Sequence, residues 1–437
     1  MTEVIVHPDL ANLPAPHAER IPVHLYGASA QPQMAAIGGP VLDVVSRIAT
    51  PVDPVAFDFL SLSLAVTAAD TFSNRSEAAD GWARDIRLVA ALADPDRWRP
   101  AIPLLERALR FLSGDQWTLE FTDGGKARPS PRPRVANKLI LDNCQSACLY
   151  SGGLDSAIGM LNLRAQRHRT VLVSHAYSHD ASRQEEILRH VHGRAPRLAL
   201  HAHPQQHLDH GNDVQMRTRS FNFFAMGTLV AATLARHFPQ GDRVPLFIPE
   251  NGLIAINPPL TNRRVGALST RTTHPHYLAL IQSVLELVRL PVQLHNPFAD
   301  RTKGEMIQQC LEQDLLRGIA RLTVSCGKWK RSGQQCGKCV PCLIRRASFH
   351  ASGWQDQTPY NPSSDDLTQV LVHGADSDDL MAMILASRRF QREGLLTWVA
   401  KTGPLPNDAR ELAALVDVVG RGMAEVRAFL ASKQLLE

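Results

Sequence analysis

One short stretch, residues 147–156, constrains the fold more than any other part of the chain. The apolar run Ala147 to Tyr150 is followed at once by Ser151-Gly152-Gly153, and a helix is expected to begin near Asp155. This is the pattern of a strand, a tight glycine turn and a helix N-terminus. Glycine tolerates positive φ and close backbone approach, and the N–H groups of such a turn form a cradle for anions. The stretch therefore predicts a phosphate-binding loop in an α/β domain, with an ordinary strand-to-helix turn as the alternative.

The motif Ser-Gly-Gly-Xaa-Asp-Ser resembles the PP-loop of the ATP pyrophosphatases, which adenylate a carboxyl or carbonyl oxygen and release pyrophosphate. It is neither the dinucleotide fingerprint nor the Walker loop, because no Lys-Ser or Lys-Thr pair follows. The resemblance implies that ATP binds here and that Asp155 helps to organise phosphate and Mg²⁺, a hard cation that takes carboxylate oxygens. The residues it assigns to ATP are Ser151, Gly152, Gly153, Leu154, Asp155 and Ser156.

Four of the seven cysteines form a second motif, with the spacing C-x9-C-x2-C-x2-C. Four thiolates at this spacing suit tetrahedral Zn²⁺, and Gly337 eases the tight turn between two of them. Unrelated core cysteines or disulfides are the alternative, but packing does not require such a spacing. Four protein ligands leave no open position, so a structural zinc is expected. The predicted ligands are Cys326, Cys336, Cys339 and Cys342.

The two motifs together, about 170 residues apart, resemble the QueC family of 7-cyano-7-deazaguanine (preQ0) synthases. Three other stretches agree: Arg217-Thr218-Arg219 before an apolar helix, and Asn296-Pro297-Phe298 and Thr302-Lys303 before the cysteines. The resemblance covers about residues 136–355. It implies the α/β fold of the PP-loop ATP pyrophosphatases, which are similar to adenine nucleotide α-hydrolases, with a parallel sheet and a four-cysteine zinc site. It also implies ATP, Mg²⁺ and Zn²⁺ as cofactors and a 7-deazaguanine-type carboxylate as the small-molecule substrate.

The same resemblance assigns site residues. Mg²⁺, the loop amides and the cations Arg219 and Lys303 would disperse the charge of the transition state, although surface charge is the alternative for both cations. Glu250 and Asn251 lie outside this resemblance, and their chemistry alone suggests that they bind the edge of the base, since a carboxylate accepts two N–H bonds from a guanine-like ring. The expected catalytic residues are Asp155, Ser156, Arg219 and Lys303, and the expected substrate-binding residues are Arg217, Glu250, Asn251, Thr273 and His274.

Two features depart from the QueC pattern. Residues 1–130 have no counterpart in that family, and the segment 249–275 differs from its base-binding loop. Both features resemble QatC, the QueC-like protein of the four-component Qat anti-phage defence system. This second resemblance implies a role in antiviral defence and a protein partner from the same system.

The acyl acceptor stays open at this point. Ammonia would give an amide and then a nitrile, whereas an amino group of a partner protein would give a deazaguanine–protein amide. Two other functions also remain: a catalytically idle, nucleotide-binding scaffold held together by zinc, and a PP-loop tRNA-modifying enzyme. The intact Ser151, Asp155 and Ser156 argue against the scaffold. A tRNA-thiolating enzyme needs a reactive cysteine, and outside the zinc motif the chain has Cys144, Cys148 and Cys310.

Alternating proline and arginine at residues 128–134 predict a linker, because this pattern continues neither a helix nor a central strand. Residues 1–130 before it are predicted to form an accessory N-terminal α/β domain, with a helix near 55–72 and strands near 86–92 and 117–121. This domain also contains charged residues around a tryptophan, which we interpret as a salt-bridged structural cluster rather than a site. They are Asp70, Arg75, Trp82 and Arg84.

After the linker, short apolar runs alternate with helical stretches, which favours a parallel sheet in a PP-loop domain at residues 136–355. A helical C-terminal extension is predicted at residues 356–437. In this extension apolar residues between Leu412 and Leu430 recur at i+3 and i+4, the spacing of an amphipathic helix.

Composition sets bounds on partners and location. Hydrophobic residues make up 44% of the chain and charged residues 20%, as in globular proteins. The net charge of +5 is not clustered, so nucleic acid is not expected as a direct partner. The apolar stretch Phe221 to Leu234 is too short to span a bilayer, so no membrane partner is expected. The cysteine pattern and the lack of a leader-like N-terminus predict a cytoplasmic protein. Histidines are dense between His175 and His210, but without accompanying carboxylates we do not expect a second metal there.

Overall fold

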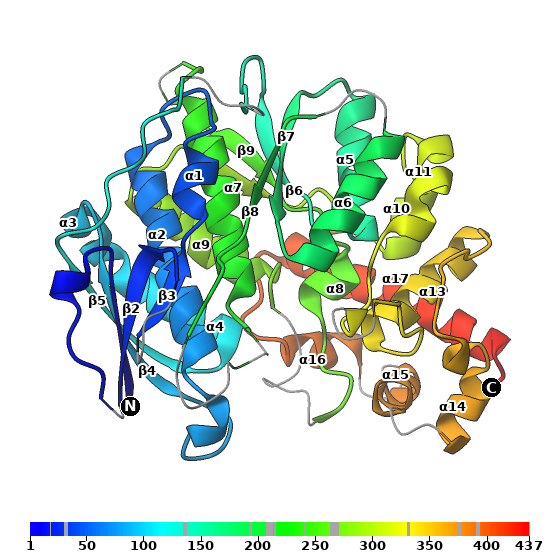
Figure 1. The fold of residues 1–437 in the computed structure, drawn as a ribbon. Coiled ribbons are helices and arrows are strands. Elements are labelled where there is room, and N and C mark those ends of the chain that lie inside the picture. Colours follow the sequence, from blue (N-terminus) through cyan, green and yellow to red (C-terminus); the bar gives the residue numbers. More distant parts are fainter. Residues whose placement is uncertain are drawn as a thin grey trace.

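The computed structural model describes the chain except for residues 18, 30–33, 134–137, 192–194, 207–212, 214–215, 240, 263–270, 330–332, 374–376, 390–393 and 437. It contains two five-stranded sheets, and helices lie between the sheets and around the second one (Figure 1). All strand pairings within the two sheets are parallel. The expected α/β class, with a parallel sheet in the PP-loop region, an added α/β region before it and helices after it, is confirmed.

The N-terminal sheet has the strand order β3-β2-β1-β4-β5. The helix and the two strands predicted in this region are present as α2, β4 and β5, and β1 to β3 are additional strands. The strands are β1 (Thr2–His7), β2 (Arg20–Gly27), β3 (Ala35–Gly38), β4 (Asp85–Ala91) and β5 (Gln116–Thr122). The helices are η1 (Leu10–Asn12), α1 (Val41–Val45), α2 (Pro54–Phe72), η2 (Arg75–Glu77), α3 (Pro95–Trp98), η3 (Arg99–Ala101) and α4 (Ile102–Ser113).

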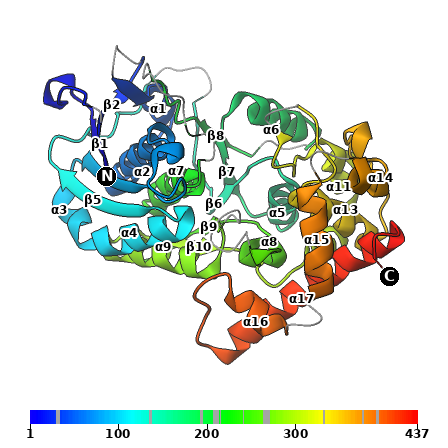
Figure 2. The same cartoon turned by 90° about the horizontal axis from the view of Figure 1, so that it is seen from below.

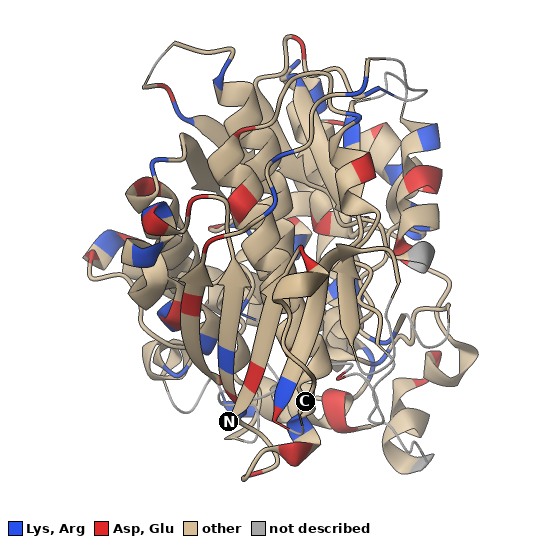
Figure 3. Ribbon diagram, turned by 60° about the vertical axis from the view of Figure 1, so that its left-hand side comes forward, with Lys and Arg blue, Asp and Glu red and all other residues tan. Residues whose placement is uncertain are grey.

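The outer face of this sheet carries charges that pair across neighbouring strands (Figure 3). Glu3 of β1 pairs with Arg20 of β2 at 2.6 Å and with Arg87 of β4 at 3.1 Å. Arg87 in turn pairs with Glu120 of β5 at 2.7 Å. Exposed pairs of this kind contribute only about 0–1 kcal/mol each, but they keep one face of the sheet polar. The opposite face is apolar and packs on α2 and α4.

The two sheets share one hydrophobic core, because α2 packs directly against α7 (Arg219–Ala235), as Figures 1 and 2 show. Phe59 of α2 meets Phe221 of α7 edge to face, with ring centroids 5.3 Å apart. Asn222 of α7 donates a 2.8 Å hydrogen bond to Ser63 of α2. The proline-rich segment has no helix or strand where it is described, although the expected domain start at residue 136 lies outside the described residues. The linker therefore joins two regions that are fused through a common core.

The charged cluster around residues 70–84 is a buried ion-pair network. Arg84 pairs with Asp70 at 2.5 Å and with Asp115 at 2.7 Å, and Arg75 pairs with Asp115 at 2.7 Å. Asp70 also accepts hydrogen bonds from the backbone N–H and the hydroxyl of Thr218, at 2.7 and 2.8 Å. The network thus ties the end of α2 to the start of α7, which is the structural role expected for it.

The second sheet has the order β10-β9-β6-β7-β8, with the PP-loop strand β6 at its centre. Because the chain runs from β6 through β7 to β8 and then crosses to β9, the strand order reverses between β6 and β9. Ligands of such sheets bind in the crevice at this switch point, beyond the carboxyl ends of the strands. The strands are β6 (Ser146–Leu149), β7 (Thr170–His175), β8 (Arg197–Leu200), β9 (Val244–Phe247) and β10 (Val292–His295).

Helices flank this sheet and continue into the C-terminal extension. Those of the PP-loop region, besides α7, are α5 (Leu154–Ala165), α6 (Ser178–His190), α8 (Gly252–Ile256), α9 (Pro275–Leu287), α10 (Lys303–Gln308), α11 (Gln313–Ile319), η5 (Ala320–Leu322) and α13 (Val340–Ser352). The extension contains η6 (Pro362–Ser364), α14 (Leu367–His373), α15 (Asp378–Arg389), α16 (Leu395–Ala400) and α17 (Ala409–Ser432). The amphipathic helix predicted between residues 412 and 430 is α17, whose apolar face is buried.

One helix of the described chain, α2, is long and apolar enough to meet the length and composition test for a membrane span. The apolar window of α2 is completely buried inside the structure, which is the position of a core helix. The apolar stretch singled out in the sequence belongs to α7, which is also buried.

Candidate nucleotide-binding active site

The glycine turn after β6 brings two serine hydroxyls together at the start of α5. Gly152 has φ +83°, the left-handed conformation that glycine adopts without strain. The hydroxyl groups of Ser151 and Ser156 lie 3.2 Å apart, and Ser156 donates to the carbonyl of Gly153 at 3.0 Å. The predicted strand, turn and helix are therefore present, with the turn at the carboxyl end of the central strand.

Three helix starts meet in the crevice at the switch point. Asp155 is in the first turn of α5 after β6, Asn251 caps α8 after β9, and Lys303 is the first residue of α10 after β10. The Lys303 ammonium pairs with Asp155 Oδ1. Asp155 Oδ2 accepts from the Asn251 side-chain amide at 2.7 Å and from its backbone N–H at 3.1 Å. Residues that are 96 and 148 positions from Asp155 thus surround a single carboxylate.

The surroundings of the two neighbouring carboxyl groups shift their pKa values in opposite directions. Burial acts to raise the pKa of Asp155, but the Lys303 charge and the hydrogen bonds to this carboxylate outweigh it, so the pKa falls below its ordinary value. Burial and the Asp155 charge both raise the pKa of Glu250 well above its ordinary value. The site therefore favours the ionised form of Asp155, next to the Lys303 cation, and disfavours a second negative charge on Glu250.

These residues line a pocket of about 510 Å³. Its walls come from the PP-loop, the loop after β9, the start of α10, the cysteine segment and the C-terminal extension. The lining residues used below are Ser151, Gly153, Leu154, Asp155, Ser156, Glu250, Lys303, Lys328 and Asp379. The pocket contains most of the residues assigned to ATP and, of the catalytic assignments, all except Arg219. The structure therefore brings the main expected site together.

Asn251 differs from its expected position at the edge of a base. Both of its amide N–H groups are occupied, one by Asp155 and one by Glu250 at 3.0 Å, and its Oδ1 accepts from the Ile254 N–H at 3.1 Å. Asn251 therefore orients the two carboxyl groups and caps α8. Glu250 does face the pocket, and its backbone is held by two hydrogen bonds with the Asn296 side chain, of 2.8 and 3.2 Å.

Two contacts that hold the PP-loop were not predicted. The buried Gln184 of α6 donates from Nε2 to the carbonyls of Ser151 and His175, at 3.1 and 3.2 Å. On the other side, the Val324 N–H donates to the Gly152 carbonyl at 3.0 Å. A glutamine within a helix gives no local signal of such a role, and Val324 stands out only because it lies next to the cysteine motif.

Arg219 is the first residue of α7, and its side chain contacts residues at the end of β7. It is not among the residues that line the pocket. Its guanidinium donates to Asp180 at 3.1 Å, contacts the His175 ring at 3.1 Å, and stacks over Tyr177 at 4.4 Å from the ring centroid. Because Gln184 bonds to both His175 and Ser151, the Arg219 cluster and the PP-loop are next to each other along the sheet edge. The catalytic role assigned to Arg219 stays a prediction.

The other three substrate-binding assignments gain no support from this geometry. Arg217 stacks on Trp82, 4.1 Å from its centroid, and donates to the Ser113 carbonyl at 2.9 Å, so it faces the N-terminal region. Thr273 and His274 are buried at the start of α9. The His274 ring bonds to Thr402 at 3.0 Å, and burial lowers its pKa to about 3, so the ring is neutral and joins two parts of the core.

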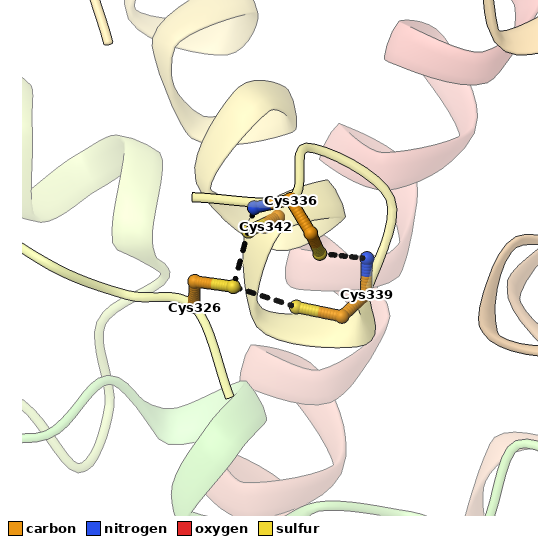
Figure 4. A group of neighbouring side chains, drawn as sticks. All are labelled: Cys326, Cys336, Cys339 and Cys342. Atoms are coloured by element: carbon orange, nitrogen blue, oxygen red, sulfur yellow. Dashed lines mark hydrogen bonds between the residues drawn. The ribbon is translucent and has the colours of Figure 1, made fainter. Parts of the chain in front are cut away.

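The four cysteines of the second motif form the cluster shown in Figure 4. Their sulfur atoms all lie within 4.8 Å of one another, and the Sγ atoms of Cys339 and Cys326 are 3.9 Å apart. Tetrahedral Zn²⁺ with bonds of about 2.3 Å requires sulfur separations of about 3.8 Å. Backbone N–H groups of Lys328 and Cys336 also point at Cys326 Sγ, each at 3.3 Å. The residues present therefore fit a structural zinc ion.

The segment that leads into the cysteine cluster also contacts the PP-loop. Gly337, in the turn between two of the cysteines, has φ +74°, and a Cβ there would lie 2.0 Å from Ser364 Oγ. The segment that enters the cluster carries Val324, which bonds to the PP-loop. Arg345 of α13, fully buried, donates to Thr323 at 2.7 Å and to the Ala320 carbonyl at 2.6 Å. The folded cysteine cluster is thus part of what shapes the candidate pocket.

A larger cavity, of about 1230 Å³, lies at the opposite, amino end of β6 to β8. Basic residues such as Arg167 and Arg169 are on its rim, and Leu172 and Val191 are in its wall. Neither the glycine loop nor the Asp155 and Lys303 pair lines it. The smaller pocket, which has these chemical groups, is the candidate active site.

Comparisons with known proteins agree with this geometry. A family model described as QueC, queuosine biosynthesis protein QueC, matches residues 272–353. The 7-cyano-7-deazaguanine synthase of Cupriavidus necator is 29% identical over 240 residues, which cover 49% of this chain and 97% of the relative. That of Cupriavidus taiwanensis is 28% identical with the same coverage, and that of Cupriavidus metallidurans is 36% identical over 92 residues. Over about half of its length, the chain is therefore similar to 7-cyano-7-deazaguanine synthases, and its residues 272–353 match the QueC family model.

Proposed function

We propose that this chain is an ATP-dependent C–N ligase that adenylates a 7-carboxy-7-deazaguanine-type carboxylate and transfers the acyl group to an amine. One observation carries the proposal: the PP-loop and the buried Asp155 and Lys303 pair line one pocket. The homology to enzymes named 7-cyano-7-deazaguanine synthase supports the deazaguanine substrate. The expected zinc site, beside the pocket, supports a structural role for the metal.

ATP would bind with its phosphates on the turn that contains Ser151, Gly152 and Gly153, where the Ser151 and Ser156 hydroxyls meet. Asp155 and Glu250 would hold a Mg²⁺ ion, whose charge would neutralise developing charge on the phosphates. A cation there would favour the ionised form of Glu250. Lys303 would add a positive charge from a buried side chain, where it would stabilise a phosphoryl transition state more strongly than a charge in water.

The first step forms a bond between a carboxylate oxygen of the substrate and the α-phosphorus of ATP, and the bond from that phosphorus to the β,γ-diphosphate breaks. This produces an acyl-adenylate and pyrophosphate. An uncharged amine then attacks the acyl carbon, the bond to AMP breaks, and the amine loses a proton. The products are an amide, AMP and pyrophosphate. If ammonia is the acceptor, a second ATP can activate the amide oxygen, and loss of that oxygen with AMP gives the nitrile.

A protein amino group is the acceptor that we propose for this chain, in the setting of an anti-phage system of the Qat type. The alignment with the Cupriavidus necator relative covers 97% of that protein but 49% of this chain, so large parts of the chain have no counterpart in it. The C-terminal extension, which lies beyond the residues that the family model matches, contributes Asp379 to the pocket wall. This addition supports an acceptor site that differs from one for free ammonia. Reduced zinc thiolates support a cytoplasmic setting for the reaction.

The alternative of tRNA thiolation finds little support in the three remaining cysteines. Cys144, Cys148 and Cys310 are all buried, and burial raises the pKa of each thiol, to about 12 for Cys148. A nucleophilic cysteine needs a lowered pKa and access to substrate. The idle-scaffold alternative is disfavoured because Ser151, Asp155 and Ser156 are all intact and line the same pocket, and an idle site has no chemical need for that combination.

The test is pyrophosphate release with ATP, Mg²⁺ and 7-carboxy-7-deazaguanine. The wild type is expected to release pyrophosphate only when the acid is present, and Asp155→Ala is expected to release none while it keeps its zinc. Intact-mass spectrometry with a candidate partner protein then identifies the acceptor: the partner gains the mass of the deazaguanine acyl group. Release that does not depend on the acid would rule out this carboxylate as the substrate.

A further inference from the structure

The C-terminal helix α17 lies behind the active site. It packs against α8, which begins directly after Asn251, against α10, which begins at Lys303, and against α13, which contains Cys342 (Figures 1 and 2). The helix lies beyond the residues 272–353 that the family model matches. None of the sequence motifs predicted a contact between this helix and the nucleotide site.

Two glycines let α17 touch the backbone next to the site residues. Gly252 directly follows Asn251, and a Cβ on it would lie 2.7 Å from the Val418 methyl groups. Gly304 directly follows Lys303, and a Cβ on it would lie 2.5 Å from Glu425 Oε1. Val418 and Glu425 are seven residues apart, which places them on the same face of the helix. One face of α17 therefore contacts the chain immediately behind both residues that pair with Asp155.

Glu425 bonds to the chain on both sides of Lys303. Its carboxyl group accepts a hydrogen bond from the Gly304 N–H at 3.2 Å and another from the Thr302 hydroxyl. One turn earlier on α17, Arg421 pairs with Glu305 and donates to the Asp300 carbonyl at 2.9 Å. The segment that carries Lys303 is thus held by side chains from α17 both before and after the lysine.

We propose that Glu425 is a positioning residue for Lys303: by binding Thr302 and Gly304 it holds the lysine ammonium against Asp155, so that the C-terminal extension is required for adenylation. The role in adenylation rests on the proposed function, whereas the positioning of Lys303 does not. Thr302 already forms a capping box with Glu305, in which each residue bonds to the backbone of the other. An additional carboxyl group from a distant helix is therefore not needed merely to start α10.

The charge of Glu425 adds a pH-dependent readout. Burial is the main effect on its pKa and raises it to about 7, with Glu305 raising it and Thr302, Gly304 and Arg421 lowering it. The ionised carboxylate is the stronger hydrogen-bond acceptor. As the pH rises through 7, the hydrogen bond from the Gly304 N–H to Glu425 should therefore become stronger. Three other charged groups lie next to this network: Arg421 pairs with both Glu305 and Asp417.

The variant Glu425→Gln tests the proposal, because glutamine keeps the size but cannot accept at both positions. Glu411→Gln is the matched control: the same change, on the same helix, at an exposed residue. In the full-length, zinc-loaded protein, Glu425→Gln should speed hydrogen exchange in the peptide 302–308 about tenfold. It should also raise the rate at which acetic anhydride labels Lys303 by a similar factor. Glu411→Gln should leave both rates within about twofold of the wild type.

Activity then tests the link to catalysis. Glu425→Gln should lower kcat for acid-dependent pyrophosphate release about tenfold and change KM for ATP much less. In the wild type, kcat should rise between about pH 6 and 8 as Glu425 ionises. The variant should lack the part of this rise that is due to Glu425. Unchanged exchange and labelling would overturn the proposal, and so would faster labelling with an unchanged kcat and pH profile. A wild type that releases no pyrophosphate would refute the proposed function instead. The exchange and labelling rates would then still decide whether Glu425 positions Lys303.

Discussion

The replacement Lys303→Met measures how strongly the buried ion pair holds the site together. Lys303 and Asp155 each have only 8% of the side chain exposed. Methionine keeps the apolar stem but leaves the Asp155 carboxylate without its cation. Removing one partner of a buried pair costs about 3–5 kcal/mol. The two hydrogen bonds from Asn251 remain, so we expect a loss near the lower end, about 3 kcal/mol in the free energy of unfolding at pH 7.

The pH dependence of this loss has a definite sign. In the wild type the folded-state pKa of Asp155 is lowered, so its contribution to stability is present above the unfolded pKa of about 3.9 and disappears as the pH falls through the lower folded value. In Lys303→Met burial acts without the opposing lysine, and the pKa of Asp155 should rise. The stability gap between wild type and variant should therefore be widest near neutral pH and narrow as the pH falls below about 4.

The assay is a double-mutant cycle with Asp155→Asn, in which urea unfolding is followed by circular dichroism with zinc kept saturating. Because each single change leaves one buried partner unpaired, the double variant should be more stable than the sum of the two losses predicts, by about 2 kcal/mol. Lys126→Met, at an exposed lysine, serves as the control and should stay within about 0.5 kcal/mol of the wild type. Losses that simply add, within about 0.5 kcal/mol, would refute the reasoning about this pair.

Three further predictions concern the supports of the site. Gln184→Ala removes the hydrogen bonds to the Ser151 and His175 carbonyls. It should weaken ATP binding, measured by titration, about tenfold without changing the zinc content, and ATP binding as tight as in the wild type would contradict the role of Gln184. Cys342→Ser should abolish stoichiometric zinc, measured by plasma mass spectrometry, and lower Tm; retained zinc would show that three ligands suffice. Arg84→Met leaves two buried aspartates with fewer partners and should cost about 3–5 kcal/mol in urea unfolding, whereas Arg87→Met on the outer sheet face should cost less than about 1 kcal/mol.

The sequence was most informative where function depends on neighbours along the chain. The turn Ser151-Gly152-Gly153 and the cysteine spacing are local patterns, so the loop, the helix after it and the sulfur cluster could be predicted before the structure. The alternation of short strands with helices likewise predicted the parallel sheet, because crossover helices leave that pattern. The substrate-binding roles expected of Arg217 and His274 stay predictions, because Arg217 stacks on Trp82 and the His274 ring bonds to Thr402.

The contacts that were missed are those between residues far apart in the sequence. Asn251 was expected beside a base, but its amide is used by Asp155, 96 positions away. Glu425 lies 121 positions from Gly304, and an amphipathic helix pattern does not show what its buried polar residues contact. Only the packing of α17 on α10 reveals that contact. The common core of the two sheets was also not predictable, because the proline-rich linker indicated separate domains whereas α2 and α7 pack directly on each other.

The most direct test of the central claim follows one oxygen atom. When 7-carboxy-7-deazaguanine labelled with ¹⁸O in its carboxyl group reacts with ATP, attack of that oxygen on the α-phosphorus leaves it in the AMP that the amine later displaces. The account predicts AMP that is two mass units heavier, formed together with the amide and absent with Asp155→Ala. Unlabelled AMP would show that water, rather than the carboxylate, attacks the α-phosphorus, and would contradict carboxylate adenylation at this site.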